Sequence, residues 1–163
     1  MLKEHQINDL VTVLEEEYKV YEDILKLSKQ KTDIIVEGKV AELDNIVRLE
    51  QAFVQQIARI ENHRERIFND ILPGKKDINM SELKKLSNNE QNKLLEAYQT
   101  KLTETVNELK RTNQLNAKLI KNSLEYIEFS INIMSNADVT SNNYGNVGAD
   151  SKKTRRNFFD MKL

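Results

Sequence analysis

Seam positions of a heptad repeat run through the first 37 residues of this chain at alternating steps of four and three. They are Ile7, Val11, Leu14, Tyr18, Tyr21, Leu25, Ser28, Thr32 and Ile35. This spacing is typical of a helix that packs against other helices. Leu10 and Ile24 widen the apolar stripe, which indicates more than one neighbouring helix. The pattern therefore predicts an all-α fold with a first helix over about residues 2–37.

Two further segments repeat the pattern, and helix-breaking residues bound them. Gly38 is suited to a left-handed helix end, and Pro73 cannot continue a helix. We expect these helices over about residues 40–72 and 89–135. Because the turn at Gly38 is very short, the first two helices should form an antiparallel hairpin. The predicted fold is an antiparallel three-helix bundle of long coiled-coil-like helices.

The connection over residues 73–88 should hold one or two helical turns, from Ser81 to Leu86. Asn88 and Gln91 have the spacing of a capping box, which marks the start of the next helix. After Met134 the sequence becomes small and polar, which indicates a linker. We therefore expect a helical bundle over residues 1–136 and a flexible tail over residues 137–163.

Composition excludes several classes of function. The chain has no Cys and only 2 His, so we expect no metal site, no cofactor and no thiol chemistry. The net charge of −1 argues against nucleic acid as a partner. No apolar run is long enough to span a membrane, and no signal peptide is visible, so we expect a cytoplasmic protein. No catalytic constellation is readable, and we expect no enzyme.

Hairpin symmetry predicts that the third helix extends past the turn at Gly38. Its overhanging part, from about residue 122 to 134, should then expose an apolar seam that binds a partner protein. The seam residues are Leu124, Ile127, Ile131 and Met134. Two alternatives stay open. In the first, the connection over residues 73–88 shifts the register of the third helix, so that the seam lies in the core of the bundle. In the second, the seam forms the interface of a homodimer.

The end of the tail is also apolar, with Phe158, Phe159, Met161 and Leu163 within the last six residues. Segments of this kind commonly fold on a partner. We therefore also predict that Phe158, Phe159 and Met161 bind the partner protein. The alternatives are a tail that docks on its own bundle and a frayed end.

A polar layer is predicted in the middle of the bundle. The same alignment places Ser28, Glu50 and Asn113 at one level, with Asn116 close by. A buried polar layer fixes the register of helices at some cost in stability. The alternative is that each side chain faces solvent. We also expect Arg64 to lay its stem over the core and pair outward.

The sequence resembles the FlgN family of flagellar export chaperones over about residues 5–150. The segments that carry the resemblance are Gln30-Lys31-Thr32-Asp33-Ile34-Ile35-Val36-Glu37-Gly38, Leu49-Glu50-Gln51-Ala52-Phe53-Val54-Gln55-Gln56-Ile57, Glu61-Asn62-His63-Arg64 and Tyr144-Gly145-Asn146-Val147-Gly148. The resemblance implies a cytoplasmic chaperone that binds hook-associated proteins, keeps them unassembled and delivers them to the export apparatus. It also implies that Tyr144 contacts the export gate. The alternative is a non-catalytic coiled-coil adaptor or regulator without a flagellar role.

Overall fold

The computed structural model describes residues 2–74 and 79–142, and these residues are almost entirely helical. The helices are α1 (Glu4–Glu37), α2 (Val40–Ile71), α3 (Met80–Leu86) and α4 (Asn89–Asn142). No strand occurs in these two ranges. The all-α class predicted from the heptad pattern is confirmed.

Gly38 ends α1 in the left-handed conformation that the sequence predicted, with φ 69° and ψ 26°. Its N–H donates to the Ile35 carbonyl at 3.2 Å, and the Lys39 N–H donates to the Ile34 carbonyl at 3.1 Å. These bonds satisfy carbonyl groups that a helix end otherwise leaves without partners. The chain then enters α2 at Val40, so only two residues separate the long helices.

Side-chain caps place the starts of α3 and α4. The Asn79 side chain accepts a hydrogen bond from the Glu82 N–H, and α3 covers the helical turns expected between Ser81 and Leu86. Asn88 and Gln91 exchange reciprocal hydrogen bonds of 3.0 and 2.9 Å between side chain and backbone. The capping box predicted from their spacing is confirmed.

Helix α4 continues to Asn142, past the end expected near residue 135. The expectation rested on the small polar residues that follow Met134. Such residues lower helix propensity by only a few tenths of a kcal/mol each. No Gly or Pro lies between Gly74 and Gly145, so nothing in this stretch forces the helix to stop.

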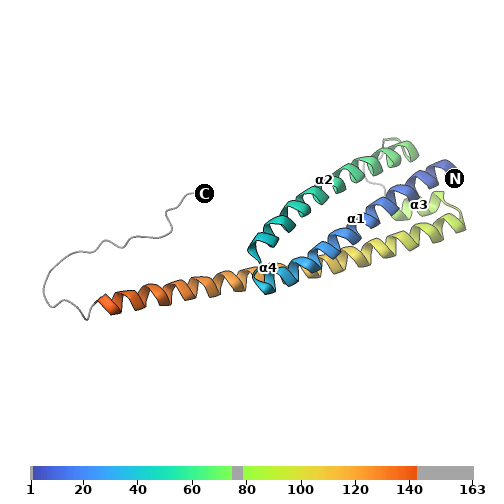
Figure 1. Cartoon of the computed structure of the whole chain (residues 1–163). Helices are drawn as coiled ribbons and strands as arrows, with labels where there is room; N and C mark the ends of the chain where they lie inside the picture. The colour runs from blue at the N-terminus through green and yellow to red at the C-terminus, as the bar shows by residue number, and fades with distance from the viewer. Residues whose placement is uncertain (1, 75–78, 143–163) are drawn as a thin grey trace. The chain divides into compact units, whose positions relative to one another are not determined.

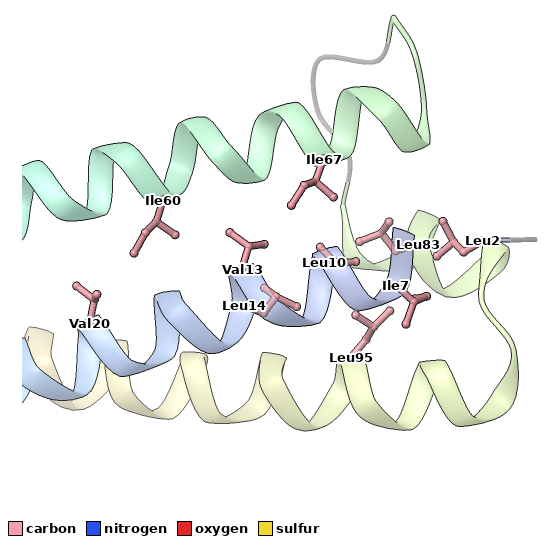
Figure 2. Packing of buried hydrophobic residues seen from close by; sticks show 10 residues of the cluster. All are labelled: Leu2, Ile7, Leu10, Val13, Leu14, Val20, Ile60, Ile67, Leu83 and Leu95. Carbon is pink, nitrogen blue, oxygen red and sulfur yellow. The ribbon is translucent and has the colours of Figure 1, made fainter. Parts of the chain in front are cut away.

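The chain divides into two compact units, Met1–Asn122 and Ser123–Leu163. In the first unit, α1 lies beside α2 and beside the first part of α4 (Figure 1). Its core lies where the start of α1 meets the end of α2, α3 and the start of α4 (Figure 2). The buried residues of this cluster are Leu2, Ile7, Leu10, Val13, Leu14, Val20, Ile60, Ile67, Leu83 and Leu95.

The half of the first unit that contains the Gly38 turn has far fewer buried apolar side chains. Outside the main cluster, the buried apolar residues are Leu27, Ile35 and Ile46. Val36 and Val40, on either side of the turn, are exposed. Since apolar burial supplies most of the stability of a packed helix, polar contacts between α1, α2 and α4 contribute a larger share of the stability here.

Candidate binding surfaces

The second unit presents an apolar surface on the last part of α4. Seven large apolar side chains between residues 124 and 134 have exposed fractions of 39–72%. They are Leu124, Tyr126, Ile127, Phe129, Ile131, Ile133 and Met134. Exposed patches of this kind mark interaction sites in soluble proteins.

Helical periodicity sorts the seven side chains into two stripes. Leu124, Ile127, Ile131 and Met134 follow steps of three, four and three, and we call them the seam. Tyr126, Phe129 and Ile133 lie about 150° away around the helix, by 100° per residue, and we call them the second stripe. All four residues predicted as the partner-binding seam are exposed in the described structure.

Four other predicted site residues lie outside the described residues. They are Tyr144, Phe158, Phe159 and Met161. Their predicted roles in contacting the export gate and the partner protein stay predictions.

The predicted polar layer brings α1 and α4 together. The Ser28 hydroxyl donates to Asn113 Oδ1 at 2.6 Å, and Asn116 Nδ2 donates to the Ser28 carbonyl at 2.9 Å. Asn116 Oδ1 also accepts a hydrogen bond of 2.6 Å from the Thr32 hydroxyl. Ser28 and Asn116 are only 1% and 2% exposed, whereas Asn113 lies at the exposed edge of the layer. These bonds join the two helices at a level where buried apolar residues are few.

Glu50 occupies a different place from the other two layer residues. Its carboxylate forms a half-buried ion pair with Lys31 of α1, with Nζ to Oε2 and Oε1 distances of 2.8 and 3.0 Å. Glu50, Asn113 and Asn116 nevertheless line the same hollow. The Lys31–Glu50 pair therefore ties α2 to α1, while Ser28 and Asn113 tie α4 to α1.

A second ion pair between α1 and α2 is more deeply buried. Arg64 Nη1 lies 3.2 Å from Glu17 Oε2, and Arg64 Nη2 lies 2.7 Å from Glu61 Oε2. The Glu17 side chain is only 8% exposed. Burial raises the pKa of Glu17, and the nearby Arg64 guanidinium opposes this shift.

Sequence reasoning expected Arg64 to pair outward and overlooked Glu17 as its inward partner. Glu17 lies seven residues after Leu10 and seven before Ile24, the two residues that widen the apolar stripe of α1. An acidic residue at that heptad position signals a buried charge that needs a partner. The Glu61-x-x-Arg64 motif supplies the partner from α2.

Three adjoining hollows lie along α4 in the first unit, and two of them are also lined by residues of α1 and α2. The largest two have volumes of about 460 Å³ each, and the third about 330 Å³. They share lining residues, since Val106 belongs to two of them and Leu109, Asn113 and Ala117 belong to another pair. We call this continuous depression the groove. Its floor is α1, which contributes Leu14, Glu17, Ile24 and Lys31.

Chemistry-bearing clusters are sparse in the part of the chain that the structure describes. No group of three or more His, Asp or Glu side chains there is placed to hold a metal ion. Among the described helices, none combines the length and apolar character needed to cross a membrane. The surfaces that stand out are the apolar seam and the groove, and both are suited to binding another protein.

A family model described as FlgN protein matches residues 1–152, which is almost the whole chain. The chain belongs to the FlgN family. FlgN-family proteins are chaperones of flagellar export, so the family resemblance found in the sequence is confirmed. The match includes the seam, the groove and Tyr144.

The chain is also similar to a protein of Bacillus subtilis (strain 168) named "Uncharacterized protein YvyG". The two are 28% identical over 145 residues, which covers 88% of this chain and 90% of the relative. No solved structure matches the chain. The flagellar export role therefore rests on membership of the family.

Proposed function

We propose that the chain is a cytoplasmic, non-catalytic chaperone that binds hook-associated proteins, prevents their premature assembly and delivers them to the export gate. The observation that carries the proposal is the exposed seam of α4, on a member of a flagellar export chaperone family. An apolar helix face binds an amphipathic helix of a partner and hides the partner's own apolar surface from self-association. Hook-associated proteins are the clients that the family resemblance implies.

We further propose that α1, α2 and the first part of α4 form an antiparallel three-helix bundle that supports the client site. Three contacts between α1 and α2 support this arrangement. They join Lys31 to Glu50, Glu17 to Arg64, and Gln6 to the Asp70 carbonyl. Taken in this order, the α1 residues lie progressively closer to the start of α1, and their α2 partners lie progressively closer to the end of α2. This is the order of contacts in an antiparallel pair of helices. The terminal residues Phe158, Phe159 and Met161 extend the proposed client site.

Calorimetric titration of the full chain with a purified hook-associated protein tests the client proposal. Ile127→Glu should weaken client binding at least tenfold, which corresponds to about 1.4 kcal/mol. Ile133→Glu is the matched control, because Ile133 belongs to the second stripe and its exposed fraction of 52% nearly equals the 53% of Ile127. We expect the control to change the dissociation constant less than threefold. Equal changes of the dissociation constant in the two variants would contradict the proposal that the seam is the client-binding surface.

The delivery step has a separate test. Tyr144→Ala should leave the affinity for the hook-associated protein unchanged and should weaken capture of the chaperone–client complex by the purified cytoplasmic part of the export gate. Tyr126→Ala is the control, because it removes a tyrosine that is exposed on α4. Normal capture with Tyr144→Ala would contradict the assigned role of Tyr144.

A further inference from the structure

The second stripe is an apolar surface of the second unit that the client proposal leaves uncovered. Its members Tyr126, Phe129 and Ile133 are 72%, 62% and 52% exposed. Two of the three are aromatic, whereas the seam contains no aromatic residue. Aromatic side chains bury a large apolar area and pair favourably with other aromatic rings. The second stripe therefore suits an occupant that supplies aromatic side chains of its own.

The end of the sequence combines such aromatic side chains with positive charge. We call residues 152–163 the terminal segment. Its large apolar residues are Phe158, Phe159, Met161 and Leu163, its basic residues are Lys152, Lys153, Arg155, Arg156 and Lys162, and its one acidic residue is Asp160. Because an Arg guanidinium also stacks on aromatic rings, the basic and the apolar residues favour the same kind of surface.

The last part of α4 carries the opposite charge. Between residues 122 and 142 the sequence contains Glu125, Glu128 and Asp138 but no Lys or Arg, and Lys121 comes directly before this stretch. Glu125 and Glu128 are exposed and lie on the side of the helix between the seam and the second stripe, by 100° per residue. A segment with basic residues next to aromatic ones therefore complements this surface in charge as well as in apolar character.

We propose that, in the chain without a client, the terminal segment docks on the second stripe of its own α4. The two phenylalanines of the segment pack against the rings of Tyr126 and Phe129, and its basic residues lie beside Glu125 and Glu128. Both surfaces belong to the second unit, so the contact requires nothing of the first unit. The proposal goes beyond the client role, because it assigns a surface that the client does not use.

The connection between α4 and the terminal segment is long enough for this contact. Residues 143–151 form the connection, and nine residues of extended chain span at most about 30 Å. Measured back along the helix from Asn142, Tyr126 lies at a rise of about 24 Å and Ile133 at about 14 Å. Every member of the second stripe is therefore within reach.

The short connection also favours the chain's own segment over that of a second copy. Two binding elements joined by a short linker meet at an effective concentration on the order of 1 mM. Contacts with a dissociation constant below that value then form within one chain, even where separate chains at micromolar concentration stay apart. The contact should therefore be independent of protein concentration.

The absence of Trp from the sequence permits a fluorescence test on the full-length chain. Phe159→Trp places a single tryptophan in the terminal segment and keeps an aromatic ring there. A synthetic peptide of residues 143–163 with the same substitution is the undocked reference. We expect the full-length chain to emit at a shorter wavelength than the peptide and to be quenched less by acrylamide. Dilution should leave both differences unchanged.

A matched pair of substitutions locates the docked segment. In the Phe159→Trp chain, Ile133→Gln should move the emission toward that of the peptide, because it removes apolar surface from the second stripe. Ile127→Gln is the control and should leave the emission unchanged, since Ile127 belongs to the seam and is 53% exposed against 52% for Ile133. Glu125→Gln combined with Glu128→Gln should also move the emission toward that of the peptide.

Four results overturn the proposal. They are equal emission of the full-length chain and the peptide, a difference that disappears on dilution, equal effects of Ile133→Gln and Ile127→Gln, and no effect of removing the two Glu charges. A difference that disappears on dilution would assign the contact to a second copy. The measurement contains no hook-associated protein, so failure here is distinguishable from failure of the client role.

Discussion

Asn116 of α4 donates a hydrogen bond of 2.9 Å to the backbone carbonyl of Ser28 on α1, although that carbonyl belongs to a continuous helix. Three more hydrogen bonds surround this one. The Ser28 hydroxyl bonds to Asn113, Thr32 bonds to Asn116, and the second Asn116 bond reaches the Ser28 hydroxyl. The amide of Asn116 thus adds three hydrogen bonds between α1 and α4, to Ser28 and Thr32, whose hydroxyls also bond to Asn113 and to the Ser28 carbonyl.

Asn116→Ala should lower the free energy of unfolding by about 1–3 kcal/mol, because three hydrogen bonds between α1 and α4 are lost and each contributes about 0.5–1.5 kcal/mol. Thermal unfolding followed by far-UV circular dichroism measures the loss. Lys118→Ala, two residues along the same helix and exposed, is the control and should change stability by less than about 0.5 kcal/mol. Equal stability of the two variants would show that solvent replaces the Asn116 bonds.

The Lys31–Glu50 pair predicts non-additive effects of substitution. Glu50→Leu adds apolar surface to the groove but leaves the mostly buried Lys31 ammonium without its carboxylate. Lys31→Met with Glu50→Leu removes both charges and should be at least as stable as the wild type. A double-mutant cycle in chemical denaturation should give a coupling of about 0.5–1 kcal/mol, given that both groups are partly solvated. No coupling would mean that the pair does not hold α1 to α2.

Glu17 predicts a pH dependence of stability. Because burial raises the pKa of Glu17 in the folded chain, the folded state binds more protons than the unfolded state above the ordinary carboxyl pKa. Stability from this group is therefore present at low pH and is lost as the pH rises through the raised pKa. Glu17→Gln keeps a hydrogen-bond acceptor for Arg64 and removes this titration.

The stability of Glu17→Gln relative to the wild type should increase between pH 4 and pH 7. Denaturant unfolding at a series of pH values measures it. Glu16→Gln, at a neighbouring exposed position, is the control and should show no such trend. A relative stability that decreases over this range would mean that the Arg64 ion pair outweighs the desolvation of Glu17.

Gly38→Ala should destabilise the chain by about 1–2 kcal/mol, because the left-handed conformation of Gly38 costs a residue with a Cβ about that much free energy. Apart from the adjoining residues of the chain, no atom lies within 4 Å of the place that a Cβ would take here, so the penalty comes from the backbone. Gly38→Asn should cost less, because asparagine tolerates positive φ. The ordering of the two melting temperatures is the measurement, and equal values would contradict the backbone explanation.

A chain that ends at Asn122 should keep the first unit folded, because its buried cluster lies entirely before that residue. Its melting temperature should fall by no more than a few degrees, whereas binding of the hook-associated protein should be lost with the seam. A chain that ends at Asn136 keeps the seam and should still bind, more weakly if the terminal residues contribute. Unfolding of the shorter chain would show that residues after Asn122 stabilise the first unit.

Local signals made much of the structure predictable. The heptad steps identified the three long helices, Gly38 identified the left-handed helix end, and the Asn88–Gln91 spacing identified the start of α4. Each signal acts between residues close in sequence, so no tertiary context is needed to interpret it. The end of α4 was missed, because weak helix formers do not by themselves end a helix.

The sequence by itself determined that the chain forms long amphipathic helices, where they begin, and that residues 124–134 carry more apolar surface than one helix face needs. Tertiary structure decided which polar side chains meet: Asn116 with Ser28 and Thr32, Lys31 with Glu50, and Arg64 with the buried Glu17. It also decided that α2 and α4 leave a groove above α1. Periodicity gives the phase of a helix, but partners and gaps depend on the distance and rotation of neighbouring helices, which no single helix encodes.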